Sequence, residues 1–158
     1  MNDENEPGPV GEVVFGDGTV VRGRGRRQPL PPGPAPQFGL YLGSPPDRAG
    51  RAWLRRRPFR TDWPAEWIDW PDFRTPRRPA EAAEQIERAF ELARSGTRVE
   101  VACGGGNGRT GTVLACMATL AGEPPETAVA WVRANYRRHA VETRAQRRWI
   151  EWFAARDR

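Results

Sequence analysis

A cysteine, a run of glycines and an arginine stand together in the stretch CGGGNGRT, residues 103–110. Successive glycines let backbone N–H groups turn toward one point, where they can bind an anion. Arg109 can offer two parallel N–H donors to a bound phosphate. The same positive groups favour the thiolate form of Cys103, which is the nucleophilic form. These residues predict an anion cradle above a nucleophile, and the chemistry that uses both is attack of sulfur on phosphorus.

The loop is expected to connect a short strand to a buried helix. Val99 and Val101 alternate with polar neighbours, which is typical of a strand, and residues 109–122 are mostly apolar, which indicates a buried helix. The positive end of this helix would point at the loop and strengthen anion binding. The expected phosphate-binding residues are Gly104, Gly105, Gly106, Asn107, Gly108 and Arg109.

The chain before the loop predicts a hairpin, a strand and a helix. Residues 12–25 pair two β-branched runs around Asp17 and Gly18, a dipeptide typical of tight hairpins in which both central residues adopt positive φ. Residues 38–43 form a further strand candidate. Over residues 79–95, apolar side chains recur at intervals of three and four, which predicts a helix.

The expected fold is α/β. Two further helices are predicted over residues 124–136 and 142–156, whereas residues 48–80 show no helical period. Alternation of strands and helices favours a small, mostly parallel central sheet flanked by helices, with a β-hairpin at the N-terminus. Residues 1–10 are expected to be a disordered tail, and residues 11–158 a single domain.

Composition narrows the function classes. Two cysteines and one histidine are too few for a disulfide scaffold or a zinc cluster, so neither metal nor cofactor is expected. No apolar run is long enough to span a membrane and no signal peptide is recognisable, which favours a cytoplasmic protein, expected to be monomeric.

All 25 basic residues are arginine and the net charge is +5. Nucleic acid is not the expected partner. The RGRGRR segment, residues 22–27, is interpreted as a solvated hairpin end, with binding of RNA or an acidic peptide as the alternative.

The stretch CGGGNGRT matches Cys-x5-Arg-Ser/Thr and resembles the signature loop of the cysteine-dependent protein tyrosine phosphatases. The chain looks like a compact, dual-specificity-sized, bacterial-type member of that superfamily. The family often carries a general acid in a Trp-Pro-Asp loop, and here WPD stands at residues 70–72. The resemblance therefore implies that Asp72 protonates the leaving group, with Asp69 as the alternative acid.

The resemblance extends from about residue 66 to residue 150 and implies two further roles. Thr110 would hydrogen-bond Cys103 and assist its departure, and Gln146 in the stretch ETRAQ would position water. Gln146 also fits the buried face of the last helix, so a packing role is the alternative. The chain departs from the family at Ala102, where a histidine that helps to orient the loop usually stands.

The function that these residues imply is a metal-independent phosphomonoesterase, foremost a protein tyrosine phosphatase that works through a phosphocysteine on Cys103. Its partner would be a phosphorylated protein or peptide, with phosphotyrosine favoured. One alternative is a pseudophosphatase that only binds phosphorylated ligands, and another is a sulfur or arsenate enzyme on a rhodanese-like loop. RNA and phosphoinositide phosphatases are further variants of the same chemistry.

Overall fold

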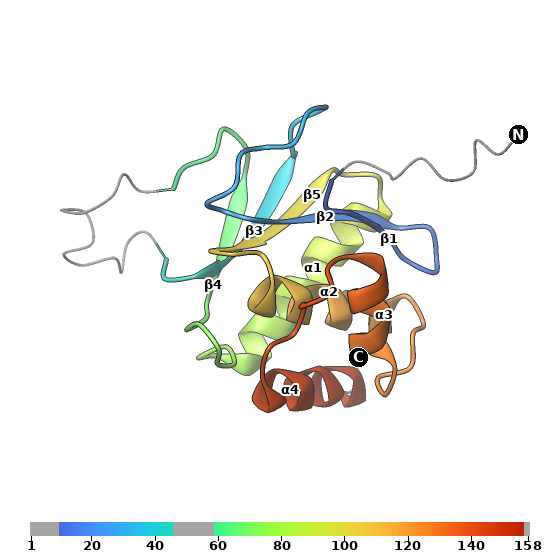
Figure 1. Ribbon diagram of the computed structural model, residues 1–158. Helices are drawn as coiled ribbons and strands as arrows, with labels where there is room; N and C mark the ends of the chain where they lie inside the picture. Colours follow the sequence, from blue (N-terminus) through green and yellow to red (C-terminus); the bar gives the residue numbers. More distant parts are fainter. Residues whose placement is uncertain (1–9, 46–58, 157–158) are drawn as a thin grey trace, which may run out of the picture.

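The computed structural model describes residues 10–45 and 59–156. Figure 1 shows the elements of these ranges. The strands are β1 (Glu12–Val14), β2 (Val20–Gly25), β3 (Phe38–Gly43), β4 (Ala65–Asp69) and β5 (Val99–Cys103). The helices are α1 (Pro79–Arg94), α2 (Gly108–Leu120), α3 (Ala128–Asn135) and α4 (Arg144–Ala155). The tail expected over residues 1–10 lies outside the described residues, apart from Val10.

The expected hairpin is present, because β1 and β2 pair antiparallel. Its turn differs from the expectation. Gly18 has a positive φ of 86°, whereas Asp17 does not, and the Gly18 N–H donates to the Phe15 carbonyl at 2.9 Å. The loop therefore covers residues 16–18, one residue more than the tightest hairpin turn. A loop of this length needs left-handed backbone only at its last position, where glycine adopts it without strain.

The sheet has the order β1-β2-β5-β3-β4, and every neighbouring pair except β1 and β2 is parallel. The mostly parallel central sheet is therefore confirmed, with β4 as an edge strand that the sequence did not predict. Gly25 pairs with Cys103, and Gly43 pairs with Asp69. Because parallel strands end at the same edge of a sheet, these four residues mark the edge from which the glycine loop departs.

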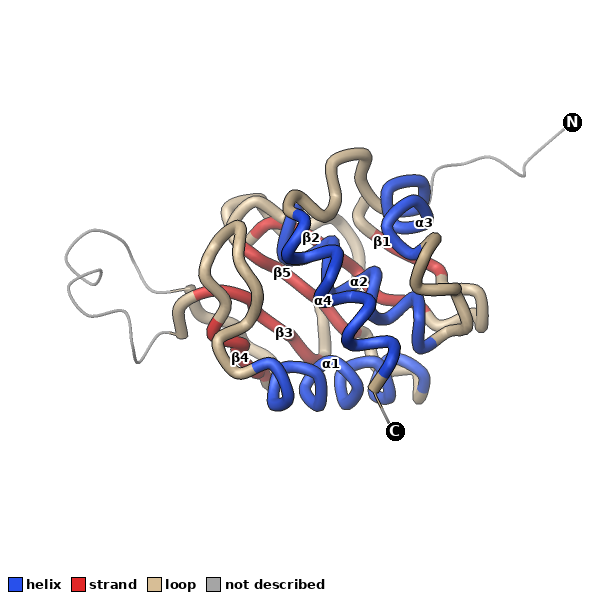
Figure 2. Tube along the Cα trace, turned by 90° about the horizontal axis from the view of Figure 1, so that it is seen from below, coloured by secondary structure: helices blue, strands red, loops and turns tan. Residues whose placement is uncertain are grey.

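The helices of the described residues lie on one face of the sheet, as Figure 2 shows from below. The apolar face predicted for α1 is buried, with Ile86 and Phe90 fully enclosed. α2 is buried over residues 108–119, because it lies between the sheet on one side and α3 and α4 on the other. Among the described residues, no helix has the length and apolarity that crossing a membrane would require.

The other face of the sheet carries a buried polar network. Glu100, fully buried in the middle of β5, accepts hydrogen bonds from Arg24 and, at 2.9 Å, from the Tyr41 hydroxyl. Trp63 Nε1 donates to the same Tyr41 oxygen at 2.8 Å. A carboxylate can be buried at low cost only when its charge and its lone pairs are matched in this way. The network holds β2 against β5 and so determines where the residues that follow β2 lie.

Candidate active site

The glycine loop leaves β5 at Cys103 and enters α2 at Gly108. The Cys103 side chain is almost fully buried, and its Sγ accepts a hydrogen bond from the Gly106 N–H at 3.1 Å. The Thr110 hydroxyl accepts from the Cys103 N–H at 2.9 Å, which ties the first turn of α2 to the last residue of β5. The loop thus curls over the sulfur with a backbone donor directed at it, which is the geometry that an anion cradle needs.

Donors from outside the loop hold its carbonyl groups. The carbonyl oxygens of residues 103–106 each accept one hydrogen bond. The donors, in the order of those residues, are the Arg26 N–H (2.7 Å), the Arg27 N–H (3.3 Å), Arg137 Nη1 (2.9 Å) and the Tyr136 hydroxyl (2.7 Å). The N–H and C=O of a peptide point in opposite directions, so carbonyls held outward turn the N–H groups of the loop inward. The segments after β2 and α3 therefore shape the cradle.

The loop also packs backbone against backbone with the end of β2. Gly106 has a φ of 83°, and a Cβ at this position would lie 2.5 Å from the Gly25 nitrogen. A Cβ on Gly25 would in turn lie 2.8 Å from the Gly104 oxygen. Both values are shorter than any ordinary contact, so no larger residue fits at either position without movement of the backbone.

Gly106→Ala is expected to lower the free energy of unfolding by about 1–3 kcal/mol, because it adds both the strain of positive φ and a clash with backbone. Thermal unfolding should show this as a Tm lower by roughly 3–10 °C. Gly105→Ala is the matched control, since a Cβ there meets nothing within 4 Å. Equal Tm values for the two variants would contradict the described packing of the loop.

Arg109 is 8% exposed, and carbonyl groups hold one side of it. Its Nη1 donates to the Trp70 carbonyl at 3.1 Å and approaches the Leu42 carbonyl at 3.5 Å. Its Nε is buried and makes no hydrogen bond with the described residues, although it lies 3.5 Å from Asp72 Oδ1. The guanidinium is therefore fixed in place with a donor unused, which suits it to bind a phosphate oxygen.

The WPD stretch directly follows β4 and turns toward the loop. Trp70 is fully buried, packs against Trp149 with ring centroids 5.5 Å apart, and donates from Nε1 to the Arg74 carbonyl at 2.6 Å. The Asp72 side chain is 58% exposed and accepts from the Phe73 N–H at 3.0 Å. The structure therefore brings Asp72 next to Arg109, with Trp70 anchoring the segment in the core.

Asp69 and Phe73 stand close to Asp72 in the chain. Asp69, the alternative acid, forms an ion pair with Arg77 at 3.3 Å at the end of β4. Phe73 has a positive φ of 62° and is 58% exposed. Positive φ is uncommon and strained for a bulky residue, and such strain often occurs at functional sites.

Gln146 lies at the start of α4 and is fully buried. It forms a capping box with Thr143, and its Oε1 also accepts from the Glu142 N–H at 2.8 Å. Its Nε2 approaches the Arg74 carbonyl at 3.4 Å, which connects α4 to residues 70–74, the acid segment. Both ends of the amide are thus engaged, and the suggested role of Gln146 in positioning water remains a prediction.

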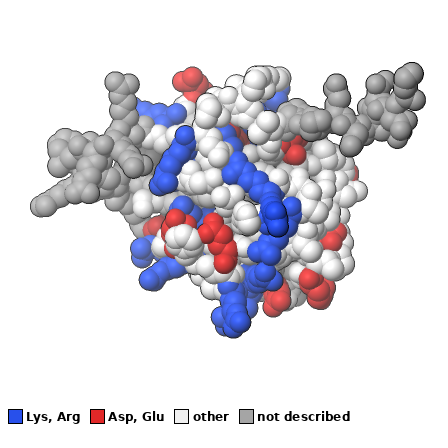
Figure 3. Space-filling view, in the orientation of Figure 1, with Lys and Arg blue, Asp and Glu red and all other residues white. Residues whose placement is uncertain are grey.

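The interpretation of residues 22–27 as a solvated hairpin end is wrong. Arg24 is only 6% exposed and pairs with Glu100, and Arg26 is half-buried beside Arg109. The signal that could have revealed this is the alternation of glycine and arginine, which lets a strand end approach another backbone closely. Figure 3 shows arginine side chains gathered across the face that Figure 1 presents, with a few acidic side chains among them.

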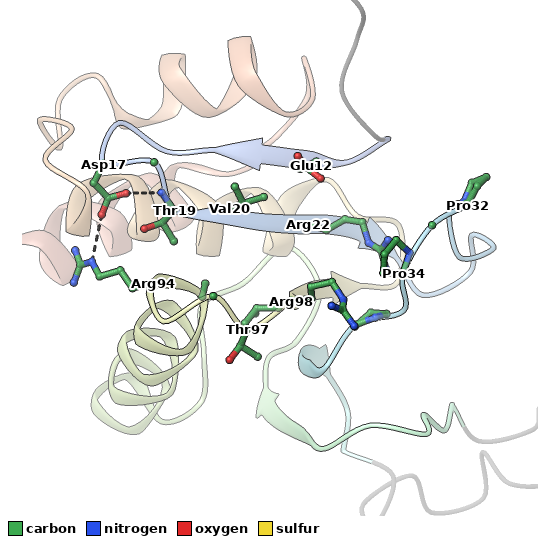
Figure 4. A pocket seen from close by; sticks show the side chains of 16 residues that line it. Glu12, Asp17, Thr19, Val20, Arg22, Pro32, Pro34, Arg94, Thr97 and Arg98 are labelled. Carbon is green, nitrogen blue, oxygen red and sulfur yellow. Dashed lines mark hydrogen bonds and ion pairs between the residues drawn. The ribbon is translucent and has the colours of Figure 1, made fainter.

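A cavity of about 840 Å³ lies at the opposite end of the strands, where β2 and β5 begin. Figure 4 shows it between the hairpin turn, the end of α1 and the proline-rich segment that includes Pro32 and Pro34. Asp17 on its wall pairs with Arg94 at 3.3 Å. Since Cys103 ends β5 and Val99 begins it, this cavity is separate from the glycine loop.

A protein-family model matches the part of the chain that forms most of the site. The family model described as PTP-SAK, the Swiss Army Knife protein DSP-PTPase phosphatase domain, matches residues 71–152, which is about half of the chain. This range contains Asp72, the glycine loop and the start of α4. No curated protein matches the sequence.

Solved structures share the fold. Tk-PTP in the active form is 24% identical, with a TM-score of 0.61 over 76% of this chain and 80% of that chain. Kinase associated phosphatase is 20% identical, with a TM-score of 0.62 over 77% and 72%. The human tyrosine phosphatase-like serine/threonine/tyrosine-interacting protein is 13% identical, with a TM-score of 0.59 over 76% and 77%. At these identities the likeness shows a common fold.

Proposed function

Because this chain belongs to the DSP-PTPase phosphatase domain family PTP-SAK, within the cysteine-dependent protein tyrosine phosphatase superfamily, we propose that it hydrolyses phosphomonoesters through a phosphocysteine on Cys103. The observation that carries the proposal is the convergence of distant residues at one place. Asp72 Oδ1 lies 3.5 Å from Arg109 Nε, and Arg109 stands in the first turn of α2, directly after the loop that encloses the Cys103 sulfur. Nucleophile, cation and acid are the groups that this chemistry needs.

In the first step the phosphate occupies the cradle, and the Cys103 thiolate attacks phosphorus. The bond from phosphorus to the leaving oxygen breaks, and Asp72 gives its proton to that oxygen. The inward N–H groups and Arg109 stabilise the charge on the three remaining oxygens. Because the carbonyls of residues 103–106 are held from outside, these donors need no rearrangement when the charge develops.

In the second step water attacks the phosphocysteine, and Asp72, now a carboxylate, takes the proton from that water. The sulfur–phosphorus bond breaks, inorganic phosphate leaves and the thiolate is restored. Thr110 holds the Cys103 backbone during the exchange through its 2.9 Å hydrogen bond. Gln146 keeps the acid segment in place through Arg74, and it can orient the water only if its capping contacts open.

Phosphotyrosine is the proposed substrate. The exposed Phe73 ring directly follows Asp72, so an aromatic leaving group could pack against it.

We also propose that residues 11–158 act as one domain, since a single core cluster contains residues from Val13 to Phe153.

The purified protein should hydrolyse para-nitrophenyl phosphate in the presence of EDTA, and vanadate should inhibit it. A phosphotyrosine peptide should give a higher kcat/KM than the matched phosphoserine peptide, because phenolate leaves more readily than alkoxide. Lack of vanadate-sensitive hydrolysis, or turnover of thiosulfate or arsenate instead, would assign the loop to another chemistry.

A further inference from the structure

The cavity of about 840 Å³ where β2 and β5 begin has mostly apolar walls. Val20 borders it and is 39% exposed, which is a large fraction for an apolar side chain in a strand. Pro32, Pro34 and Pro36 line another side, and a proline has no N–H to offer a ligand. Concave, mostly apolar hollows of this size with a few polar groups are typical of sites for small molecules. The cavity therefore suits a ligand with an apolar body.

Arg22, which also lines the cavity, is a cation without a full set of partners. Its side chain is 15% exposed, its Nη2 lies 3.6 Å from Glu100 Oε1, and its Nε is buried without a hydrogen bond to the described residues. Glu100 already accepts hydrogen bonds from Arg24 and from the Tyr41 hydroxyl. One carboxylate thus faces two guanidinium groups. A further acceptor would satisfy Arg22, because a buried donor without a partner is costly.

Arg98 adds a second positive charge at the same end of the cavity. Figure 4 shows the side chains of Arg22 and Arg98 reaching toward Pro34. Arg98 Nε donates to the Ala35 carbonyl at 2.9 Å, which holds the side chain against the proline-rich segment, although the residue is exposed. Two guanidinium groups therefore lie beside an apolar wall, where an anionic group could bind both of them.

The acidic residues around the cavity leave this positive end available. Asp17 lies at the other end, where it accepts from the Thr19 N–H at 3.0 Å and pairs with Arg94 at 3.3 Å. Glu12 on β1 is the cross-strand neighbour of Arg22, but it is exposed, so water and salt screen its charge. The cavity consequently has one polar end that is positive and one that is already neutralised.

We propose that this cavity binds a small molecule with a mostly apolar body and one carboxylate group, which pairs with Arg22 and Arg98. The two oxygens of a carboxylate can accept from both guanidinium groups, and the apolar body would pack against Val20 and the prolines. A second charged group on the ligand would lose its hydration against these walls without gaining a partner. Val99 begins β5 and Cys103 ends it, so this ligand and the phosphate in the glycine loop occupy separate sites.

Calorimetric titration with naphthalene-2-carboxylate at pH 7 tests the site, with the neutral naphthalene-2-carboxamide as the matched probe. The carboxylate should bind with a Kd on the order of 1 mM or tighter. It should bind about tenfold more tightly than the carboxamide, as expected for a charge-assisted contact. Excess inorganic phosphate should leave its Kd unchanged. Equal affinities for the two probes, no measurable binding of the carboxylate, or competition by phosphate would overturn the inference.

Variants of two lining residues identify the place of binding. Arg22→Met keeps an apolar stem and removes the charge, so the preference for the carboxylate should fall to about threefold or less. Val20→Glu and Val20→Gln have the same size, and the glutamate variant should bind the carboxylate at least about fivefold more weakly because of charge repulsion. Leu92→Glu, with the same new charge on the exposed side of α1, is the control and should bind like the wild type. An undiminished preference in Arg22→Met, or equal binding by the two Val20 variants, would place the probe elsewhere and contradict the proposal.

Discussion

Cys103→Ser is expected to lower kcat for para-nitrophenyl phosphate by about 10⁴-fold or more. A serine hydroxyl stays protonated at neutral pH and lacks the nucleophilicity of a thiolate. The other cysteine cannot replace it, because Cys116 is fully buried in α2 and burial raises the pKa of its thiol well above the ordinary value. Initial rates at saturating substrate, measured on both proteins under the same conditions, give the ratio directly.

The serine variant should still bind an anion. Serine differs from cysteine by one atom, and the donors around residues 103–106 do not depend on the sulfur. Phosphate should therefore bind Cys103→Ser with a Kd within about threefold of the wild-type value. Cys116→Ser is the control and should retain kcat. Full activity in Cys103→Ser would reject the phosphocysteine mechanism, whereas loss of activity in both variants would indicate a general effect on the fold.

Asp72→Asn is expected to lower kcat with a phosphotyrosine peptide by about 10²–10⁴-fold, the usual contribution of a general acid. Asparagine has nearly the same shape and can still accept the hydrogen bond from the Phe73 N–H, so the loss should come from the missing proton. With para-nitrophenyl phosphate the loss should be much smaller, because nitrophenolate is a weak base and leaves without protonation. Steady-state kcat values for the two substrates on each protein measure this contrast.

Asp69→Asn serves as the control for the acid. Asp69 is paired with Arg77 at the end of β4, whereas Asp72 reaches Arg109. We expect Asp69→Asn to leave the ratio of the two kcat values unchanged. If that variant shows the contrast between substrates and Asp72→Asn loses both activities equally, the proton comes from Asp69 instead.

The sequence by itself was sufficient for features that depend on neighbouring residues. The hairpin, β3, α1, β5 and the later helices were predicted because hydrophobic periodicity and glycine positions are local signals. The loop from Cys103 to Arg109 was recognised for the same reason, since its glycines and its flanking elements are contiguous. β4 was not predicted, because the exposed and buried faces of Ala65–Asp69 do not alternate cleanly in polarity.

The tertiary structure alone decided which distant groups meet the loop. Arginine side chains are normally exposed. The residue type alone therefore does not reveal that Arg24 is buried against Glu100, or that Arg26 and Arg27 reach the cradle. The sequence likewise identified Gln146 as a candidate without showing that its Nε2 approaches the Arg74 carbonyl. These contacts join segments far apart in the chain, and they arise from strand order and parallel register. Local pattern therefore determined the nucleophile and its loop, whereas packing across the sheet decided what surrounds them.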